Sequence, residues 1–343
     1  MTGGTGFLGS YLLRYLIAMG YSNIRALRRS DSPMDLVEDI ADKIDWIEGD
    51  ILDTFILEDA MEGVQQVYHC AGVVSYAPDD YQLMMDVNAE GTANIVNIAL
   101  YRKVEKLIHV SSIAAIGRRP KLPVIDEKTQ WERSSWNSAY AVSKYLAEME
   151  VWRGVAEGLS VGIVNPSVII GSGYWETGTG QLFERANNGL KFYPKGSTGY
   201  VDVRDVARFM IELMNSPVKD ERFILNGTNT TYLDFFTQIA HILGKKPPTI
   251  QVNFLLKEAA ILGEWLRSTL LRKKPLLTRH SVNHVNRDFF YRNEKSKKAF
   301  DFQYIPLAKT LAETGAQYLE AQKENRKFAI LPLIFDRKLT KNV

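Results

Sequence analysis

The sequence predicts an α/β protein with a doubly wound parallel sheet and a smaller C-terminal lobe. Short apolar runs alternate with longer helical patterns through the first half of the chain, as in successive βαβ units. The candidate strands are residues 24–27, 44–47, 67–70, 107–110 and 161–164, and the helical patterns are at about 8–19, 81–101 and 139–157. A glycine-rich segment before the first helical pattern also favours this fold class.

The composition indicates a folded protein and excludes several classes. The chain has 343 residues, 45% of them hydrophobic, and 42 Lys and Arg nearly balance 40 Asp and Glu. A near-zero net charge gives no chain-wide attraction for nucleic acid. Cys70 is the only cysteine, which excludes an internal disulfide and suits the cytoplasm. No apolar run reaches about 18 residues, so we expect no membrane span.

The pattern changes after about residue 166 and predicts two lobes with a terminal arm. The domain with the doubly wound sheet is expected to comprise residues 1–170 and about 200–225, and a substrate-binding lobe about 171–199 and 226–325. Residues 326–343 form the predicted arm, whose apolar stretch we expect to pack on the body or on a partner. The basic segment 264–298 has ten Lys and Arg against three acids and is interpreted as a solvated face.

The first nine residues, MTGGTGFLG, are a candidate phosphate-binding loop. Three glycines lie three residues apart where the first helical pattern begins. Glycine lets the backbone turn sharply and approach a pyrophosphate closely, and the amides at the helix N-terminus attract the anion. The sequence therefore predicts a dinucleotide cofactor. The loop residues expected to bind it are Gly3, Thr5, Gly6, Phe7, Leu8 and Gly9.

The start of this loop departs from the usual pattern. A phosphate-binding loop of this kind follows the central strand of its sheet, but only Met1 and Thr2 precede Gly3. A missing central strand would leave the backbone groups of two neighbouring strands without partners. We therefore hypothesise that the first strand is truncated, and that about six to ten residues precede Met1 in the whole protein.

Arg28 and Arg29, after the strand at 24–27, bear on the choice of nicotinamide cofactor. An NAD enzyme usually has a carboxylate there that binds the ribose 2′-hydroxyl. Guanidinium groups instead bind a 2′-phosphate through charge-assisted hydrogen bonds, so NADP(H) is favoured. The alternative is NAD(H), with both arginines solvated and Asp31 at the ribose. Asp50 and Ile51 follow the strand at 44–47 and are expected to lie at the adenine.

A tyrosine and a lysine form the candidate reacting centre. Tyr140 and Lys144 are four residues apart and therefore share one face of a helix. An unperturbed phenol, with a pKa of about 10, exchanges protons poorly near neutral pH. A neighbouring ammonium stabilises the phenolate and so makes the exchange easier. Ser112 follows the strand at 107–110, at the carboxyl edge where such sheets bind ligands, and is placed to hydrogen-bond a reacting carbonyl oxygen. These three residues are the predicted catalytic group.

Taken together, these motifs resemble the extended short-chain dehydrogenase/reductases, also called the NAD-dependent epimerase/dehydratase family. The matching segments are TGGTGFLG (2–9), GDILD (49–53), VYHCAGVV (67–74), VNAEGTANI (87–95), HVSSIAAIG (109–117), YAVSK (140–144), VNPSVIIG (164–171) and YVDVRDVA (200–207). They span roughly the first 215 residues. Within the family, these sequence motifs are most similar to those of the dihydroflavonol-reductase-like and hopanoid-associated epimerase-like branch.

The resemblance implies a nicotinamide-binding Rossmann domain, catalysis through Ser112, Tyr140 and Lys144, and a small lobe that closes over the substrate. It also implies further cofactor contacts by Ala71, Gly72, Asn88, Pro166 and Ser167, of which the last two lie against the nicotinamide. A homodimer through the helices at 81–101 and 139–157 is likewise implied by the resemblance.

Three functions follow from this pattern, and the first is preferred. It is reduction of a ketone or aldehyde by NADPH, or the reverse oxidation of an alcohol. The alternative is a nucleotide-sugar epimerase or dehydratase with tightly bound NAD, which Asn165 would support. A non-catalytic protein of the same fold is disfavoured because the three catalytic residues are present. The loop at 73–76 and the segment around Tyr174 and Trp175 are expected to line an apolar substrate pocket.

The five histidines show no spacing typical of a metal site. His280 and His284 are four residues apart but lack an accompanying acidic pattern, so no metal is predicted. Residues 254–271 form an amphipathic pattern that we interpret as a core helix and not as a membrane or partner contact. The expected partner is a small carbonyl or alcohol substrate.

Overall fold

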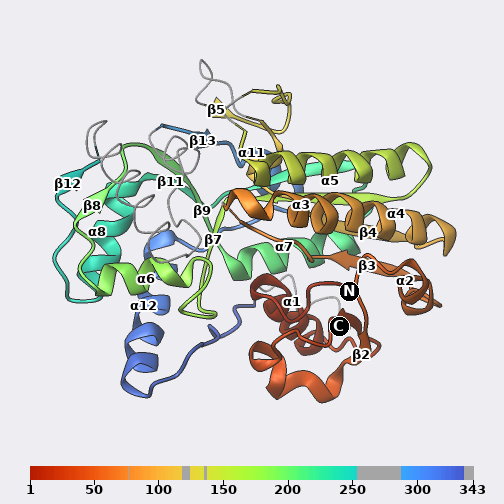
Figure 1. Cartoon of the computed structure of the whole chain (residues 1–343), viewed down its shortest axis with the longest axis horizontal. Coiled ribbons are helices and arrows are strands. Elements are labelled where there is room, and N and C mark those ends of the chain that lie inside the picture. The colour runs from red at the N-terminus through yellow and green to blue at the C-terminus, as the bar shows by residue number, and fades with distance from the viewer. Residues whose placement is uncertain (76, 118–123, 135–136, 253–286, 336–343) are drawn as a thin grey trace.

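The computed structural model describes residues 1–75, 77–117, 124–134, 137–252 and 287–335, and it confirms the doubly wound fold. Parallel strands form the central sheet, with helices on both faces (Figure 1). The strands are β1 (Arg25–Arg28), β2 (Asp45–Glu48), β3 (Gln66–His69), β4 (Lys106–Val110), β6 (Val161–Pro166) and β10 (Glu221–Leu225). The two inner strands β4 and β6 are almost wholly buried, as expected for a parallel sheet that is covered on both faces.

Met1 and Thr2 lie in the centre of this sheet, between β1 and β3. Thr2 forms parallel bridges with Leu27 of β1 and with His69 of β3. These contacts join the pair β2–β1 to the run β3–β4–β6–β10, which gives one sheet with its order reversal at Thr2. The carboxyl ends of β1, β3 and β4 consequently meet where a doubly wound sheet binds its ligand.

Helices cover both faces of the sheet. One face carries α1 (Phe7–Ala18) and α7 (Val203–Asn215), and the other carries α2 (Thr54–Ala60), α4 (Gly91–Tyr101) and α5 (Ala139–Ala156). Side-chain caps start several of these helices: Asp53 caps α2, Ser138 caps α5 and Asp202 caps α7. The 3-10 segments η1 (Asp35–Lys43), η2 (Pro78–Asp80) and η4 (Ile113–Ala115) complete this region.

The helical pattern predicted at 81–101 is interrupted. It consists of α3 (Tyr81–Met84), a π-helical segment η3 (Met85–Glu90) and then α4. Asn88 lies in the π-helical segment and bonds with its side chain to both backbone polar groups of Val73. Widened turns of this kind often occur where a helix presents a functional side chain. This side chain holds the loop after β3.

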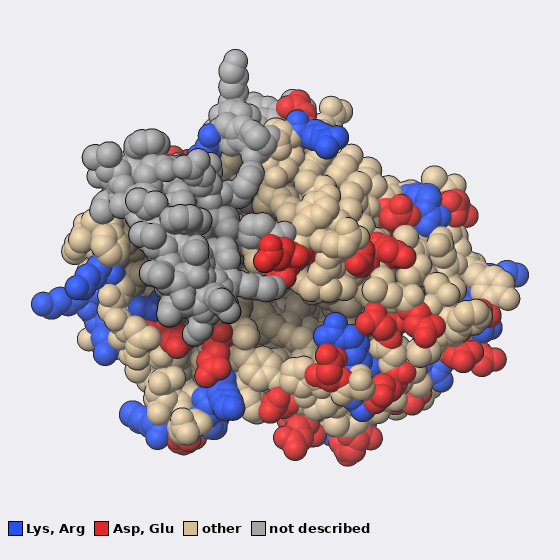
Figure 2. Space-filling model, in the orientation of Figure 1, with Lys and Arg blue, Asp and Glu red and all other residues tan. Residues whose placement is uncertain are grey.

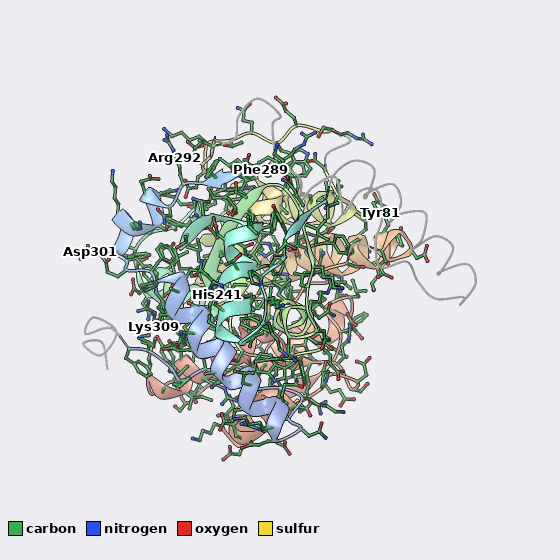
Figure 3. All side chains as sticks on the ribbon, turned by 90° about the vertical axis from the view of Figure 1, so that its left-hand side faces the viewer. Tyr81, His241, Phe289, Arg292, Asp301 and Lys309 are labelled. Atoms are coloured by element: carbon green, nitrogen blue, oxygen red, sulfur yellow. The ribbon has the colours of Figure 1, made fainter. Side chains whose placement is uncertain are left out.

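The second lobe is built on a three-stranded sheet of β7 (Val168–Ile170), β9 (Ser197–Asp202) and β11 (Thr228–Thr231). Two helices, α8 (Tyr232–Ile242) and α12 (Leu307–Lys323), lie side by side there, as the labelled His241 and Lys309 show in Figure 3. The other elements are α6 (Gly180–Asn187), α11 (Glu294–Phe300), β5 (Val124–Ile125), β8 (Phe192–Tyr193), β12 (Ile250–Gln251) and β13 (Phe290–Tyr291).

The apolar stretch near the C-terminus packs on the body of the protein. The hydroxyl of Tyr11 on α1 accepts a hydrogen bond from the amide of Leu331, and the Tyr15 hydroxyl accepts one from Ile334. Residues 336–343 of the predicted arm, the amphipathic pattern at 254–271 and most of the basic segment lie outside the described residues. Within the described part of the chain, no helix is long and apolar enough to cross a membrane.

Candidate active site

A cavity of about 430 Å³ opens at the carboxyl ends of β1, β2 and β3. Figure 2 shows the surface hollowed near the centre of this face, with basic side chains beside the hollow. Ten of the predicted cofactor residues line the cavity: Gly3, Thr5, Gly6, Phe7, Arg28, Arg29, Asp50, Ile51, Ala71 and Gly72. Its wall does not include Leu8, Gly9, Asn88, Pro166, Ser167 or the three predicted catalytic residues.

The glycine loop has the shape that a pyrophosphate requires. Gly3 has φ of 69°, and a Cβ there would lie 2.6 Å from the amide nitrogen of Ala71. A Cβ at Gly9 would overlap the carbonyl of Gly3, so this residue permits the close packing of loop and helix. Gly6 is the N-cap of α1 and makes no side-chain cap. The first amides of α1 are thus available to an anion in the cavity.

Two arginines line the cavity at the end of β1. Arg28 ends β1 and lies 3.5 Å from the carboxylate of Glu48, while Arg29 pairs with Asp31 at 3.1 Å. Both carboxylates are more than half exposed, so these pairs are weak and water-screened. The guanidinium groups can therefore exchange these partners for a phosphate at the wall of the cavity.

Lys144 is the buried cation of the predicted catalytic group. Its side chain is 5% exposed, and its ammonium donates a 2.8 Å hydrogen bond to the carbonyl of Val110 at the end of β4. Burial lowers the pKa of Lys144 to about 8, while the negative charge of Glu148 opposes that decrease. The lysine is thus a cation near neutral pH, with its proton less tightly held than in water.

The loop after β3 connects the cavity to Lys144. A Cβ added to Gly72, which lines the cavity, would lie 3.2 Å from the side-chain oxygen of Asn88 and 3.9 Å from the Lys144 ammonium. The Asn88 amide nitrogen also donates to the hydroxyl of Ser143 on α5, at 2.9 Å. Asn88 therefore does not line the cavity, and instead joins the loop at its inner end to the helix that bears Lys144.

Ser112 and Tyr140 come from two elements that both contact the end of β4. Ser112 is the N-cap of η4, and its hydroxyl accepts a 3.1 Å hydrogen bond from the amide of Ala114. Tyr140 lies in the first turn of α5, one turn before Lys144, and is half-buried. The structure thus brings the predicted serine, tyrosine and lysine to one edge of the sheet, beyond Gly72 at the inner end of the cavity.

The segment around Pro166 is buried beside the site. Asn165 and Pro166 end β6, and Ser167 is 5% exposed, without a hydrogen-bond partner for its hydroxyl among the described residues. The Asn165 amide nitrogen donates to the carbonyl of Ser112 at 3.0 Å and to the carboxylate of Glu148 at 2.8 Å. Asn165 is therefore directed into the protein and not toward a bound sugar diphosphate.

The cavity wall contains residues that the sequence pattern did not identify. They are Ser32 and Pro33 after β1, and Gly171, Gly173 and residues 177–180 in the turn of residues 171–180. Tyr174 of the same turn, which was expected to line a pocket, lines this cavity. The expectation for Trp175 was wrong: it is 2% exposed and packs edge-on against Tyr318 in the core of the second lobe, 5.2 Å between ring centroids.

The histidines near the site are structural. His69 and His109 are buried on neighbouring strands with their rings 5.2 Å apart, and burial lowers the pKa of His69 to about 3. His69 bonds to the hydroxyls of Thr2 and Thr92. Among the described residues no three His, Cys, Asp or Glu side chains form a metal cluster, and His280, His284 and Tyr76 lie outside those residues.

Comparison with known proteins identifies the class to which this fold and site belong. Residues 1–226 match the NAD dependent epimerase/dehydratase family. The chain therefore belongs to this family, whose members are NAD(P)-dependent reductases, epimerases and dehydratases.

Individual relatives cover nearly the whole chain. The sequence is 27% identical to sterol demethylase protein B of Methylococcus capsulatus, over 92% of this chain and 96% of that protein. It is 29% identical to a putative dihydroflavonol 4-reductase of Synechocystis sp., over 91% and 92% of the two chains. The crystal structure of gox2253 superimposes with a TM-score of 0.79 at 30% identity, covering 95% of this chain and 98% of that one.

Proposed function

We propose that this protein is an NADP(H)-dependent reductase of a ketone or aldehyde. The observation that carries the proposal is the buried Lys144 ammonium close behind Gly72, which lies in a cavity wall that also contains Arg28 and Arg29. One residue supplies the cation that a catalytic tyrosine needs, and the two arginines supply the charge that a 2′-phosphate needs.

The chain's own residues suit this reaction. NADPH, when bound along the cavity, supplies the hydride. Ser112 and Tyr140 hydrogen-bond the carbonyl oxygen of the substrate, and Tyr140 donates its phenolic proton to that oxygen as it becomes an alcohol. Lys144 lowers the cost of the resulting phenolate, and its bond to Val110 holds it in place. Gly3, Gly6 and the amides of α1 hold the pyrophosphate.

The substrate class that we propose is a largely apolar carbonyl compound. The names of two relatives refer to a sterol and to a dihydroflavonol, which are both ring compounds with extensive apolar surface. The alternative is a nucleotide-sugar epimerase or dehydratase with resident NAD, a chemistry that the family also includes. The burial of Asn165 removes the one residue that specifically favoured this alternative, so we prefer the reductase.

The two proposals predict different cofactor content. The purified protein would be denatured and the supernatant examined for released nicotinamide, and NADPH and NADH would then be titrated by fluorescence. An empty site with much tighter NADPH binding, together with NADPH oxidation by a dihydroflavonol or an aromatic aldehyde, supports the reductase. Stoichiometric bound NAD and no carbonyl-dependent oxidation of NADPH would instead identify an enzyme that returns its hydride within one turnover.

We also propose a homodimer through the face formed by α3, α4 and α5. Four large apolar side chains on these helices are 36–67% exposed, namely Tyr81, Leu83, Tyr101 and Met149. Burial of such residues stabilises a dimer. Light scattering on a size-exclusion column tests this, and a monomeric mass for the wild type would contradict it.

A further inference from the structure

One buried carboxylate is bonded to several elements around the catalytic group. Glu148 is 1% exposed and lies on α5, one helical turn after Lys144. One of its oxygens accepts from the hydroxyl of Ser111 at 2.6 Å and from the Asn165 amide at 2.8 Å. The other accepts from the guanidinium of Arg222 at 2.9 Å and from the Trp152 indole at 3.4 Å. Both oxygens are thus fully engaged.

These bonds connect the two elements that carry the catalytic side chains. Ser111 directly precedes Ser112, and Asn165 donates to the carbonyl of Ser112 while it donates to Glu148. Glu148 itself is on the helix of Tyr140 and Lys144. Glu148 therefore joins the segment of Ser112 to the helix of Tyr140, beside the direct bond from Lys144 to the carbonyl of Val110.

Arg222 extends this arrangement to the neighbouring loop. It lies on β10, and its guanidinium also donates to the carbonyls of Glu127 and Thr129. Its charge neutralises Glu148, which would otherwise be a costly buried anion. Glu148 favours the Lys144 ammonium, and the buried Cys70, His69 and His109 also interact with that charge. Because Arg222 offsets the charge of Glu148, its removal should strengthen the effect of Glu148 on Lys144.

We propose that Glu148 is a positioning residue for the reaction: it fixes Ser112 relative to Tyr140 through Ser111 and Asn165, and it places a carboxylate one helical turn from Lys144. This inference rests on the proposed function, since it concerns the same catalytic group. A purely structural role predicts lower stability alone. A positioning role predicts changes in turnover and in pH dependence whose direction depends on the charge that is removed.

The first test is the pH profile of Glu148→Gln, which removes the charge and keeps the shape. Loss of a neighbouring anion disfavours the Lys144 ammonium, so the basic limb of kcat/KM for carbonyl reduction moves to lower pH by about one unit. The turnover number falls between about tenfold and a hundredfold with little change in the KM for NADPH. The matched control is Glu150→Gln, at a half-buried carboxylate on the same helix that pairs with Arg153; it leaves the pH profile and the turnover number unchanged.

Two further variants separate charge from position. Arg222→Gln removes the opposing charge, so the same basic limb moves to higher pH. Asn165→Ala removes the bond to Ser112 and keeps the Glu148 charge, so turnover falls while the limb stays in place. These variants also test the inference if Glu148→Gln fails to fold. The inference is overturned if the basic limb of kcat/KM in both Glu148→Gln and Arg222→Gln coincides with that of the wild type. Unchanged turnover in Asn165→Ala also overturns it.

A failure of the proposed function is distinguishable from a failure of this inference. If the wild type binds NADPH but reduces none of the carbonyl probes, the proposed reaction is wrong. The charge effect is then measured in the pH dependence of NADPH affinity, which requires only the Lys144 ammonium at the cofactor. Opposite shifts in Glu148→Gln and Arg222→Gln support the inference there, and identical affinity profiles overturn it.

Discussion

The hydroxyl of Tyr174 donates a 2.7 Å hydrogen bond to the carboxylate of Asp35. Tyr174 lies in the turn that forms one wall of the cavity, and Asp35 begins η1, two residues after Pro33 in another wall. Residues 327 and 328 also contact this turn. The amide of Trp175 donates to the carbonyl of Lys327, and the Tyr174 ring packs edge-on against Phe328. The Tyr174–Asp35 hydrogen bond therefore joins two walls of the cofactor site.

Breaking of the Tyr174–Asp35 hydrogen bond is expected to limit the rate at which the cofactor is released. Tyr174→Phe removes one hydrogen bond, worth about 1 kcal/mol, and should therefore speed NADPH dissociation about fivefold, as measured by stopped-flow fluorescence. The matched control is Tyr21→Phe, which removes an exposed tyrosine bond to Asn215 away from the cavity and should leave the rate unchanged. Equal NADPH dissociation rates in Tyr174→Phe and the wild type would show that this hydrogen bond does not limit release.

Tyr140→Phe tests the proton donor. Without the phenolic proton the carbonyl oxygen cannot be protonated directly, so turnover should fall by at least about a hundredfold. NADPH affinity should remain within about twofold, because the aromatic ring remains; fluorescence titration and NADPH oxidation check the two quantities. Tyr145→Phe on the same helix keeps the ring that stacks on Trp131 and serves as the control. Retained turnover in Tyr140→Phe would contradict the assigned role.

Arg28→Ala tests the choice of cofactor. Loss of a charge-assisted bond to the 2′-phosphate, together with an unpaired Glu48 nearby, should weaken NADPH binding between about tenfold and a hundredfold and leave NADH binding nearly unchanged. Arg102→Ala, at an arginine that pairs with Glu58, is the control. If both cofactors weaken equally, the 2′-phosphate is recognised elsewhere, and the proposed preference for NADP(H) loses its basis.

The pH dependence of catalysis should reflect Lys144. Its pKa is lowered by burial to about 8, so the fraction of cationic lysine falls as the pH rises through that value. Carbonyl reduction, which needs the ammonium and the phenol proton, should therefore decline above about pH 8. A profile of kcat/KM against pH measures this decline. A flat profile up to pH 10 would mean that bound cofactor keeps Lys144 charged.

The sheet and most of the cavity were predictable because they depend on local sequence. The five strands that were predicted match β1, β2, β3, β4 and β6 to within two residues, since buried parallel strands are short, mainly apolar runs. Strand β10 of the same sheet was not predicted as a strand. Residues of the phosphate loop and the arginines after β1 line the cavity as expected, because a strand end fixes where the next few side chains lie.

Long-range contacts were not predictable from a single sequence. Glu148 is an ordinary helix residue by composition, and only the folded chain shows the four donors that converge on it. Trp175 was wrongly placed for the same reason, because the direction of a loop side chain depends on the helix that packs against it. The π-helical segment around Asn88 also follows from a tertiary bond, to the loop after β3.

Tyr11→Phe tests how firmly the C-terminal stretch is held. Its hydroxyl donates to the carbonyl of Ser172 at 2.8 Å and accepts from the amide of Leu331 at 2.7 Å, and both bonds are buried. Removal leaves two backbone groups unsatisfied and should lower the free energy of unfolding by about 2–4 kcal/mol in urea titration. Tyr101→Phe, with its side chain 67% exposed, should change it by less than about 0.5 kcal/mol.

The same contacts have a consequence for how the chain folds during its synthesis. Helix α1 follows the phosphate loop, yet its Tyr11 and Tyr15 hydroxyls find their partners only at residues 331 and 334, more than 300 positions later. The ribosome must therefore release residues 331–334 before this helix can pack completely. The domain with the parallel sheet consequently cannot complete its packing progressively from α1 onward.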